Sequence, residues 1–439
     1  MGFRFVHAAD LHLDSPFKGL AELPNELREQ VLQSTFTAWD KLVDLTIRCG
    51  ADALLLGGDL FDGAHRTLRA EWRLRRGLDR LGEAHVQVFI IHGNHDPMKQ
   101  SEPWSEAEHV HVFGTHEPLS LPLFNQQGEW VAVVTGMSYG EAAVYDNLAS
   151  LYPREPERRV HQQTGRSVPD SMYRIGLLHG TVDSSKDHDP YAPCTKEELV
   201  QKGYDYWALG HIHVRQLLST DPYIVYPGNL QSRHIKETGA KGAYVVDVHD
   251  DHSTELAFHA LDCMRWFEME LNLHEASSLQ QAGDMLLRAV EDIREASEGR
   301  SAFVRMTLCA SPAVQHDLLQ GDLQQELLEL WKESEWPRLE SEESIVWPLQ
   351  IMVNREGTSD LERWREADHF IGDVVRLGDA LLQDKEELAA LLEEVLGSFY
   401  GQRRLRQWLQ HQSEAEQEKW MRHALQLVVG RLDQGGEKG

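Results

Sequence analysis

The segment "VFIIHGNHDPM", residues 88–98, constrains more than any other how this chain can fold. It begins as a continuous run of apolar β-forming residues and then passes Gly93 into three polar side chains, which are Asn94, His95 and Asp96. An amide, an imidazole and a carboxylate are costly to place at the edge of a core unless they bind something. The sequence therefore predicts a buried strand that delivers ligand-type side chains to a functional site.

Four other predicted strands end in the same way. The polar residues at their ends are Asp10, His12, Asp59, Asp62, His179, His211 and His213. In an open α/β sheet the carboxyl ends of the strands share one edge, where ligands collect. Asp10 and His12 lie two residues apart, as do the last two histidines, so we expect each pair to point the same way from an extended chain.

The pooled side chains favour a metal site. Carboxylates, imidazoles and one carboxamide, without sulfur, suit Mn²⁺ or Fe²⁺ better than a closed structural zinc site. Seven of these side chains are candidates for direct metal ligands, which is too many for one four-coordinate ion. Seven ligands fit two ions that share a carboxylate. Two ions roughly 3.5–4 Å apart are the usual device for displacement at phosphorus. The alternative is that these side chains only cap the strand ends. Because five strands in order all end in ligand-type side chains, we favour a dinuclear site.

Composition bounds the remaining possibilities. The chain has 439 residues, which predicts two or three domains. Its four cysteines form no CxxC pair, as expected in a reducing cytoplasm. No secretion signal opens the chain, and no apolar stretch approaches the roughly 20 residues that span a bilayer. A formal charge of −28 counts against a large sequence-independent DNA footprint, although a local nucleic-acid site built around cations stays open.

The organisation changes along the chain. Up to about residue 260, continuous apolar runs alternate with amphipathic helical segments, which indicates sheets that are covered on both faces. Residues 142–172 have the composition of a loop. Strand patterns with helices at 277–297 and 312–331 then predict a small α+β unit, and beyond 361 only helical periodicity remains. We predict three domains, 1–261, 262–355 and 356–439.

The order of motifs resembles a known superfamily. Asp-x-His, Gly-Asp-x-x-Asp, Gly-Asn-His-Asp, a single His and Gly-His-x-His together resemble the calcineurin-like metallophosphoesterases. Within them, "HAADLHLDSPF", "GGDLFD" and "YPGNLQSRHIKETGAKG" are similar to the SbcD-type DNA double-strand-break repair nucleases, above all to their bacterial YhaO-type branch. The resemblance covers roughly residues 1–260. It implies an α/β fold: a two-sheet β-sandwich core flanked by helices, a small α+β cap domain and a C-terminal helical region.

The resemblance also implies residue roles. One metal ion would bind Asp10, His12 and His213. The other ion would bind Asn94, His179 and His211, and Asp59 would bridge the two. A metal-bridging hydroxide would attack the phosphodiester phosphorus. His95 would steady the developing charge or protonate the leaving oxygen, with Asp96 holding its imidazole. Mn²⁺ is the expected metal, with Fe²⁺, Mg²⁺ or Zn²⁺ as alternatives.

One position departs from part of the family. Archaeal and eukaryotic relatives carry a histidine, linked to exonuclease action, where this chain has Asp62. Bacterial SbcD-type members also have aspartate there. Exonuclease and endonuclease action therefore both stay open, and we expect Asp62 to position a ligand or a loop.

Two segments are candidates for contacting DNA. Five arginines recur at spacings of three and four and are expected to share one helical face: Arg66, Arg69, Arg73, Arg76 and Arg80. They could track a phosphate backbone, lie beside a dimer interface, or simply pair with acidic neighbours. After the last ligand pair, a turn presents Asn229, Gln231 and Arg233, which could contact a nucleotide or be ordinary surface residues.

The family resemblance extends to partners. It implies a cytoplasmic, nucleoid-associated bacterial homodimer that acts on DNA and does not bind membranes. Its C-terminal helices, with Trp408, Leu409 and Trp420 among their apolar residues, would dock the coiled-coil base of an SbcC-like or YhaN-like ATPase. Two rival functions are a phosphatase or cyclic-nucleotide phosphodiesterase on the same metal core, and a DNA-end-binding scaffold with little catalysis.

Overall fold

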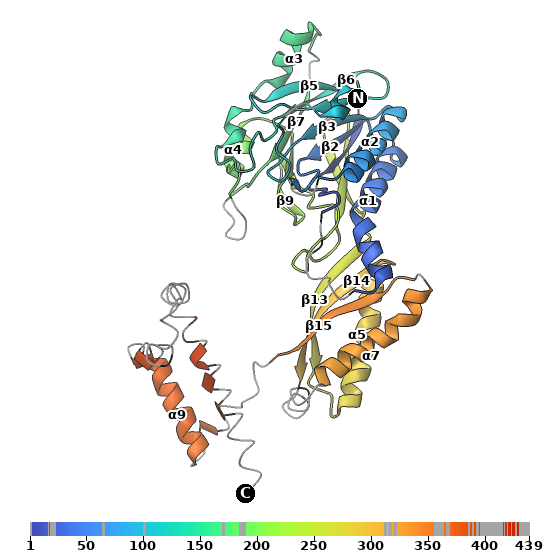
Figure 1. Ribbon diagram of the computed structural model, residues 1–439. Helices are drawn as coiled ribbons and strands as arrows, with labels where there is room; N and C mark the ends of the chain where they lie inside the picture. Colours follow the sequence, from blue (N-terminus) through green and yellow to red (C-terminus); the bar gives the residue numbers. More distant parts are fainter. Residues whose placement is uncertain are drawn as a thin grey trace. The chain divides into compact units, whose positions relative to one another are not determined.

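The predicted apolar runs form the central strands of two six-stranded sheets (Figure 1). In spatial order the first sheet contains β12 (Thr254–Ala260), β11 (Gly242–Val248), β1 (Phe3–Ala8), β2 (Ala53–Gly57), β3 (Gln87–Ile91) and β4 (Val110–Val112). The second contains β5 (Leu119–Phe124), β6 (Trp130–Gly136), β7 (Tyr173–His179), β8 (Tyr206–Gly210), β10 (Tyr223–Tyr226) and β9 (Gln216–Thr220). Strands β1 to β4 are mutually parallel, as are β6, β7, β8 and β10.

The fold is described here from a computed structural model. The residues it describes are 2–15, 17, 23–63, 66–99, 102–168, 172–183, 190–310, 314, 318, 323–341, 343–354, 364–365, 369–384 and scattered positions from 387 to 429. No helix among these residues is both long enough and apolar enough to cross a bilayer.

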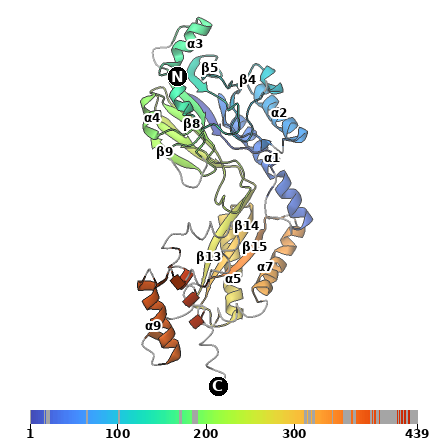
Figure 2. The ribbon, with the colours of Figure 1, turned by 60° about the vertical axis from the view of Figure 1, so that its left-hand side comes forward.

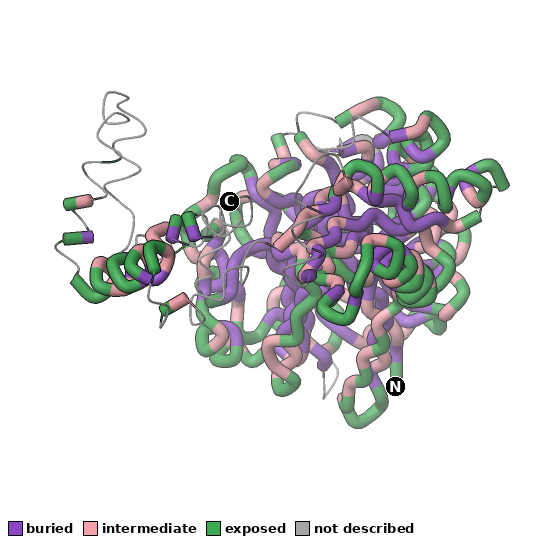
Figure 3. Tube along the Cα trace, turned by 90° about the horizontal axis from the view of Figure 1, so that it is seen from below, coloured by how far each residue is buried: buried purple, intermediate pink, exposed green. Residues whose placement is uncertain are grey.

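The two sheets pack face to face through an apolar layer. Phe5, Leu55 and Phe89 enter it from the first sheet, and Ile175 and Tyr206 enter it from the second. All five side chains are fully buried or nearly so, and Figure 3 shows the buried strands in purple. Because the strands are buried on both faces, they read as continuous apolar runs rather than as alternating patterns. The predicted two-sheet α/β core is therefore confirmed.

Helices cover the outer face of the first sheet. α1 (Asn25–Arg48) and α2 (Leu68–Glu83) lie side by side there in Figures 1 and 2 and pack through Phe36, Trp39 and Leu74. α2 begins at Leu68, because the Thr67 side chain accepts a hydrogen bond from the Ala70 amide and caps the helix. The prediction that Arg66 shares the helical face was therefore wrong, since it precedes the helix. The outer face of the second sheet carries η3 (Leu148–Leu151) and α4 (Lys196–Gln201).

Two predictions about local structure were wrong. The segment 142–172 is not only loop, because α3 (Pro156–Thr164) forms within it, with proline at its first position. The second helix of the α+β unit, predicted at 312–331, continues as α7 (Leu323–Glu340) beyond the predicted end at 331, and most positions from 311 to 322 lie outside the described residues. The helix continues through Pro337, although proline usually breaks or kinks the interior of a helix.

Beyond residue 262 a third sheet orders its strands as β13 (Met264–Leu273), β14 (Ser301–Ala310) and β15 (Val346–Val353). α5 (Leu279–Ala296) and α7 complete the α+β pattern, and α9 (Phe370–Gln383) belongs to the helical region that follows. Trp408 and Leu409 lie outside the described residues. Leu425 packs against Val375 of α9, so at least this apolar side chain is used within its own region.

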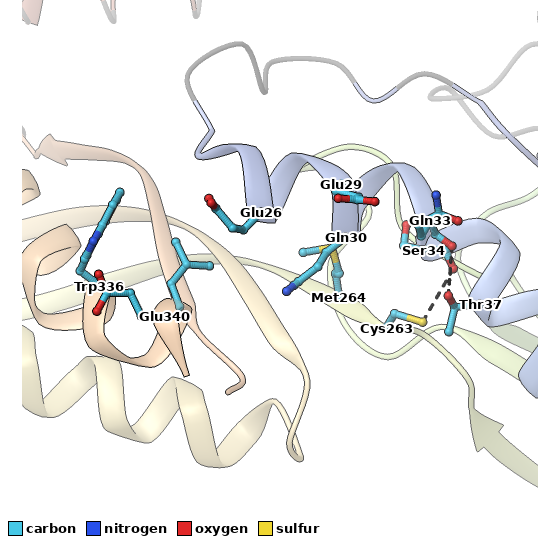
Figure 4. Close-up of a pocket in the computed structure, with 11 residues that line it drawn as sticks. Glu26, Glu29, Gln30, Gln33, Ser34, Thr37, Cys263, Met264, Trp336 and Glu340 are labelled. Carbon is cyan, nitrogen blue, oxygen red and sulfur yellow. Dashed lines mark hydrogen bonds between the residues drawn. The ribbon is translucent and has the colours of Figure 1, made fainter. Parts of the chain in front are cut away.

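The chain divides into two compact units. One comprises Met1–Glu268, Val290–Arg305 and Lys332–Leu349, and the other comprises Met269–Ala289, Met306–Trp331 and Gln350–Gly439. The domain boundaries at 261 and 355 stay predictions. Within the first unit a groove of about 770 Å³ follows one face of α1 (Figure 4). The residues that line it include Glu26, Glu29, Cys263, Trp336 and Glu340, and none of the predicted metal ligands.

Candidate metal centre

The five strand ends meet at one edge of the sandwich. His179, the last residue of β7 in the second sheet, places Nδ1 2.8 Å from the carbonyl oxygen of Gly57, the last residue of β2 in the first. The amide of His211, after β8, donates to the carboxylate of Asp10, after β1, at 3.0 Å. These contacts join the two sheets, and they bring together polar residues that are far apart in the sequence.

The first predicted ligand set converges. Suitable ligand atoms of Asp10, His12 and His213 all lie within 4.8 Å of one another. The Nε2 atoms of the two histidines are 3.2 Å apart. Asp10 and His12 are buried, and His213 is partly exposed at the mouth of the site. This geometry leaves a small space that is lined by one carboxylate and two imidazoles.

The second set converges beside the first. The Asn94 side-chain oxygen lies 3.0 Å from Nε2 of His179 and 3.2 Å from Nδ1 of His211. Asp59 stands between the two sets, with Oδ2 3.5 Å from Nε2 of His179 and 3.8 Å from Nε2 of His12. All seven predicted ligands are therefore in one place, with the predicted bridging carboxylate in the middle.

Asp59 provides the test of whether these residues fit metal ions. Its Oδ1 accepts a hydrogen bond from the His95 amide at 2.9 Å, but the buried Oδ2 has no hydrogen-bond partner. An unsatisfied carboxylate oxygen in a core costs about 1–3 kcal/mol or more. A cation coordinated by Oδ2 removes this cost, so the orphaned oxygen fits an ion bound between the two sets.

The electrostatics of the other ligands fit as well. Burial raises the pKa of Asp59 to about 7, with the Asp96 carboxylate adding to the effect, and burial raises the pKa of Asp10 well above its usual range. Burial also lowers the pKa of His179 to about 4 and the pKa of His12 well below its usual range. Neutral imidazoles are what metal ligation requires, and divalent ions stabilise crowded carboxylates. The donor set fits two divalent cations.

The backbone of the site is strained. Four ligands lie in the left-handed region, with φ of 53° at Asp10, 41° at His12, 51° at Asp59 and 98° at His211. Non-glycine residues pay on the order of 1–3 kcal/mol each for such conformations, which persist where function requires them. The expectation that each i, i+2 pair projects from an extended chain was therefore wrong, because the strands end before the ligands and the chain turns sharply.

Two glycines make room for the ligands. A Cβ atom on Gly93 would lie 2.3 Å from Oδ1 of Asp59 and 2.6 Å from the His179 ring. A Cβ atom on Gly58 would lie 2.5 Å from Nδ1 of His179, and Gly58 also has a positive φ of 94°. The glycines of "GGDLFD" and "GNHD" are thus required by the close approach of side chains to the backbone.

His95 lies at the open side of the site. Its ring centroid is 4.9 Å from that of His12, and its side chain is 41% exposed. Its Nδ1 lies 3.0 Å from Oδ1 of Asp62, whose other oxygen accepts a hydrogen bond from the Ser15 hydroxyl. Although burial opposes ionisation of Asp62, these hydrogen bonds lower the pKa of its carboxyl. Asp62 therefore supports the imidazole of His95.

The predicted support of His95 by Asp96 was wrong. The buried Asp96 carboxylate accepts the amide hydrogens of Leu60 and Gly93, both at 2.8 Å, and lies 3.2 Å from Nδ1 of His92. It thereby joins the loop after β2 to the loop after β3. Asp96 thus shapes the backbone that carries Asp59 and Asn94, and the Nδ1 atom of His95 is held by Asp62 instead.

The arginine stripe is used largely within the protein. Arg66 precedes α2 and makes a bidentate ion pair with Glu102, while Arg73 and Arg80 pair with Asp40 and Asp44 of α1. Arg69 donates a hydrogen bond to Gln33 of α1, and the guanidinium of Arg76 lies over the ring of Trp72. Of the interpretations above, pairing with acidic neighbours accounts best for the stripe. Its contact with DNA stays a prediction.

The turn after β10 places its three candidate residues differently, and contact of Arg233 with DNA stays a prediction. Asn229 and Gln231 are buried, at 0% and 2% exposure, and hydrogen-bond to the backbone around them, so as placed they cannot contact a nucleotide. Arg233 does reach the site. Its guanidinium donates to the Ser15 hydroxyl at 2.7 Å and lies 3.6 Å from Asp62.

Sequence reasoning missed two residues that hold His213. Glu237 lies with Oε1 2.7 Å from its Nδ1, and Lys241 donates to its backbone carbonyl oxygen at 2.8 Å. A histidine that ligates a metal through one nitrogen generally needs a partner on the other nitrogen. That rule could have directed attention to Glu237, but no spacing in the sequence identifies which carboxylate fills the role.

The chain is similar in sequence to known proteins. The family model for calcineurin-like phosphoesterases matches residues 3–215. The "uncharacterized metallophosphoesterase YhaO" of Bacillus subtilis (strain 168) is 37% identical over 380 residues, covering 84% of this chain and 85% of that protein. The "DNA double-strand break repair protein Mre11" of Sulfurisphaera tokodaii is 27% identical over 257 residues, covering 56% of this chain and 60% of that protein.

Among solved structures, the TT1561 protein of Thermus thermophilus aligns with a TM-score of 0.33 and 13% identity, covering 59% of this chain and 99% of that one. The family assignment rests on the sequence relatives, one of which aligns over most of both chains. The ligand geometry and these relatives agree, and the chain belongs to the calcineurin-like phosphoesterase family of metallophosphoesterases.

Proposed function

We propose that this protein is a dinuclear-metal phosphodiesterase that hydrolyses DNA in repair, with Mn²⁺ as its metal. The observation that carries the proposal is the buried, unpartnered Oδ2 of Asp59 between two sets of ligand side chains. Support for DNA as the substrate comes from the Mre11 relatives, which are named as double-strand-break repair proteins. The resemblance to SbcD-type nucleases in the motif segments agrees with that substrate.

The chemistry divides between the ions and the chain. Two bound divalent ions would lower the pKa of water and offset charge that develops at phosphorus. The chain supplies the ligands and excludes water from the buried side of the site. His95 stands at the open side, where its Nε2 can deliver a proton to the leaving oxygen while Nδ1 is held by Asp62.

Arg233 is our candidate for contacting the DNA backbone. Its guanidinium lies beside the Asp62–His95 pair, and the side chain is 14% exposed. A planar guanidinium also suits bidentate recognition of phosphate oxygens. We favour Arg233 over the stripe from Arg66 to Arg80, because most of the stripe's charge is balanced by carboxylates of the same chain.

We further propose a homodimer and an ATPase partner. Leu68 and Trp72 lie one turn apart on α2 and are 85% and 58% exposed, so two large apolar side chains stand next to each other at the surface. They form a surface that a second copy can cover. The C-terminal helical region is the candidate site for an SbcC-like or YhaN-like coiled-coil ATPase, which could also supply the positive surface that a chain of net charge −28 lacks.

The test is cleavage by the purified protein alone. Labelled single-stranded, double-stranded and hairpin DNA are each incubated with Mn²⁺, with Mg²⁺ or with EDTA, and bis-p-nitrophenyl phosphate serves as a small ester. We expect DNA cleavage with Mn²⁺ that EDTA abolishes. Hydrolysis of the small ester without cleavage of any DNA would favour the phosphatase or cyclic-nucleotide alternative. DNA-end binding without hydrolysis of either substrate would favour the scaffold.

A further inference from the structure

His213 is held from outside the metal centre by one short segment of chain. Glu237 approaches its imidazole at Nδ1, at 2.7 Å, and Lys241 holds its carbonyl oxygen at 2.8 Å. Both partners follow β10, about 25 residues further along the sequence. The orientation of this ligand is therefore set by residues that lie outside the motif Gly-His-x-His.

The carboxylate of Glu237 has no freedom to turn. Its Oε2 accepts the Arg233 amide hydrogen at 2.7 Å and a side-chain amide hydrogen of Asn229 at 3.0 Å, while Oε1 faces His213. The side chain is only 16% exposed. Glu237 thus faces every neighbour as an acceptor.

An acceptor at Nδ1 decides the tautomer of the imidazole. Nδ1 must carry the hydrogen, so Nε2 carries the lone pair that a metal ion needs. This Nε2 is the atom that faces His12 across the first ligand set, at 3.2 Å. His179 in the second set obtains the same result from a neutral acceptor, the Gly57 carbonyl oxygen.

We propose that Glu237 is a positioning residue that fixes the tautomer of His213 and so determines how tightly the Asp10–His12–His213 set binds its ion. The inference rests on the proposed metal-dependent function and deepens it. Through the backbone of Arg233, the same carboxylate also ties the metal ligand to the arginine assigned to DNA. Glu237 connects metal loading with the position of Arg233.

Glu237→Gln separates this role from simple packing, because the two side chains have nearly the same size. Arg233 and Asn229 both present hydrogen-bond donors, so the amide must turn its oxygen toward them and its NH₂ group toward His213. Nδ1 then has to accept, Nε2 gains the hydrogen, and the lone pair for the metal is lost. A glutamine that preserves the fold should therefore impair the ligand.

The experiment uses the full chain and two readouts. Mn²⁺ binding is measured by titration calorimetry, and the tautomer of His213 is read at pH 8 in metal-free protein from imidazole ¹⁵N shifts, assigned with His213→Gln. Glu157→Gln is the matched control, since Glu157 is also buried and hydrogen-bonded, to Arg174, but touches no ligand. Melting temperatures without metal establish that each variant is folded.

We expect the wild type to bind two Mn²⁺ and to carry the hydrogen of His213 on Nδ1. In Glu237→Gln the hydrogen of His213 should move to Nε2. One of the two Mn²⁺ ions should then bind about 10–100-fold more weakly, while the affinity for the other ion should not change. Glu157→Gln should match the wild type. The inference fails if a folded Glu237→Gln variant binds both Mn²⁺ ions as tightly as the wild type does. It also fails if His213 of the wild type carries its hydrogen on Nε2. Either result leaves the proposed function standing. A wild type that binds no Mn²⁺ overturns the proposed function with it.

Discussion

Asp59 concentrates the physical problem that this site presents. A carboxylate with one satisfied and one orphaned oxygen, buried beside Asp10, is a poor choice for stability and a good one for holding cations. Its left-handed backbone adds strain at the same position. The sequence motif predicted that Asp59 would be central, but only the structure shows which of its oxygens lacks a partner.

Asp59→Asn is expected to reduce Mn²⁺ binding from two ions to at most one and to abolish cleavage. Without metal, the variant should melt at or above the wild-type temperature, since it no longer buries a charge without a partner. Calorimetric stoichiometry and melting curves in EDTA and in Mn²⁺ measure both effects. Full Mn²⁺ binding by the variant would show that Asp59 does not bridge.

His95→Ala should lower the rate of DNA cleavage by about 10²–10⁴-fold while two Mn²⁺ still bind. Asp62→Asn should lower the rate less, because it weakens the contact that orients the imidazole of His95 but keeps that imidazole in place. Asp96→Asn, by contrast, should weaken metal binding, since Asp96 joins the loops that carry the ligands. Wild-type cleavage by His95→Ala would remove His95 from the reaction.

These pairings mark the limit of sequence reasoning for single residues. The types and order of residues predicted seven candidate ligands that the structure brings together, because metal coordination restricts which side chains can serve. Proximity in sequence pointed to Asp96 as the partner of its neighbour His95, and this was wrong. Hydrogen-bond partners depend on loop geometry, and a turn at "GNHDP" directs adjacent side chains in different directions.

At the scale of elements, the buried strands were predictable and the edges of the sheets were not. β1, β2, β3, β7 and β8 have apolar runs that nothing but a covered sheet explains. Strands such as β9 and β12 have exposed or alternating residues and short connections, so their sequences do not distinguish them from loops. The helix α7 extends through a proline because its packing, with Trp331 and Leu339 buried, outweighs the local preference.

One buried histidine links the two sheets and should contribute to the loss of stability in acid. His7 on β1 contacts the Tyr206 hydroxyl at 3.0 Å and the Leu209 carbonyl oxygen at 3.2 Å on β8. Burial lowers its pKa to about 3, whereas an unfolded chain binds the proton near pH 6.5. As pH falls from about 6.5 toward 3, the unfolded state takes up a proton that the folded state refuses, so stability declines by about 1.4 kcal/mol per pH unit.

His7→Gln should flatten this decline, since the variant has no imidazole to protonate. Melting temperatures measured in EDTA between pH 7 and pH 4 test the prediction. The matched control is His249→Gln, which removes an exposed histidine and should leave the pH dependence unchanged. An equally steep decline in His7→Gln and in the wild type would place the acid sensitivity elsewhere.

At the scale of the whole molecule, charge and exposed apolar surface have to be reconciled with the proposed DNA substrate. A net charge of −28 repels DNA, so binding of that substrate would depend on the metal site, on Arg233 and on the proposed partners. The arginines of α2 do little to change this, because they balance the carboxylates of α1. Composition predicted this conflict, but the sequence alone could not assign the ion pairs.

Trp72→Glu should convert the proposed homodimer to a monomer, because it places a charge at the centre of the exposed apolar surface of α2. Sedimentation equilibrium measures the change. Leu151→Glu is the control, since Leu151 is also exposed but lies on η3. A wild type that sediments as a monomer at all concentrations would contradict the dimer.

The central claim is that two cations bind on either side of Asp59. Anomalous diffraction from crystals grown with Mn²⁺ tests it most directly. We predict two manganese peaks, one contacted by Asp10, His12 and His213 and the other by Asn94, His179 and His211, with Asp59 touching both. A map without peaks at this edge of the sandwich, or with Asp59 turned away from them, would contradict the account.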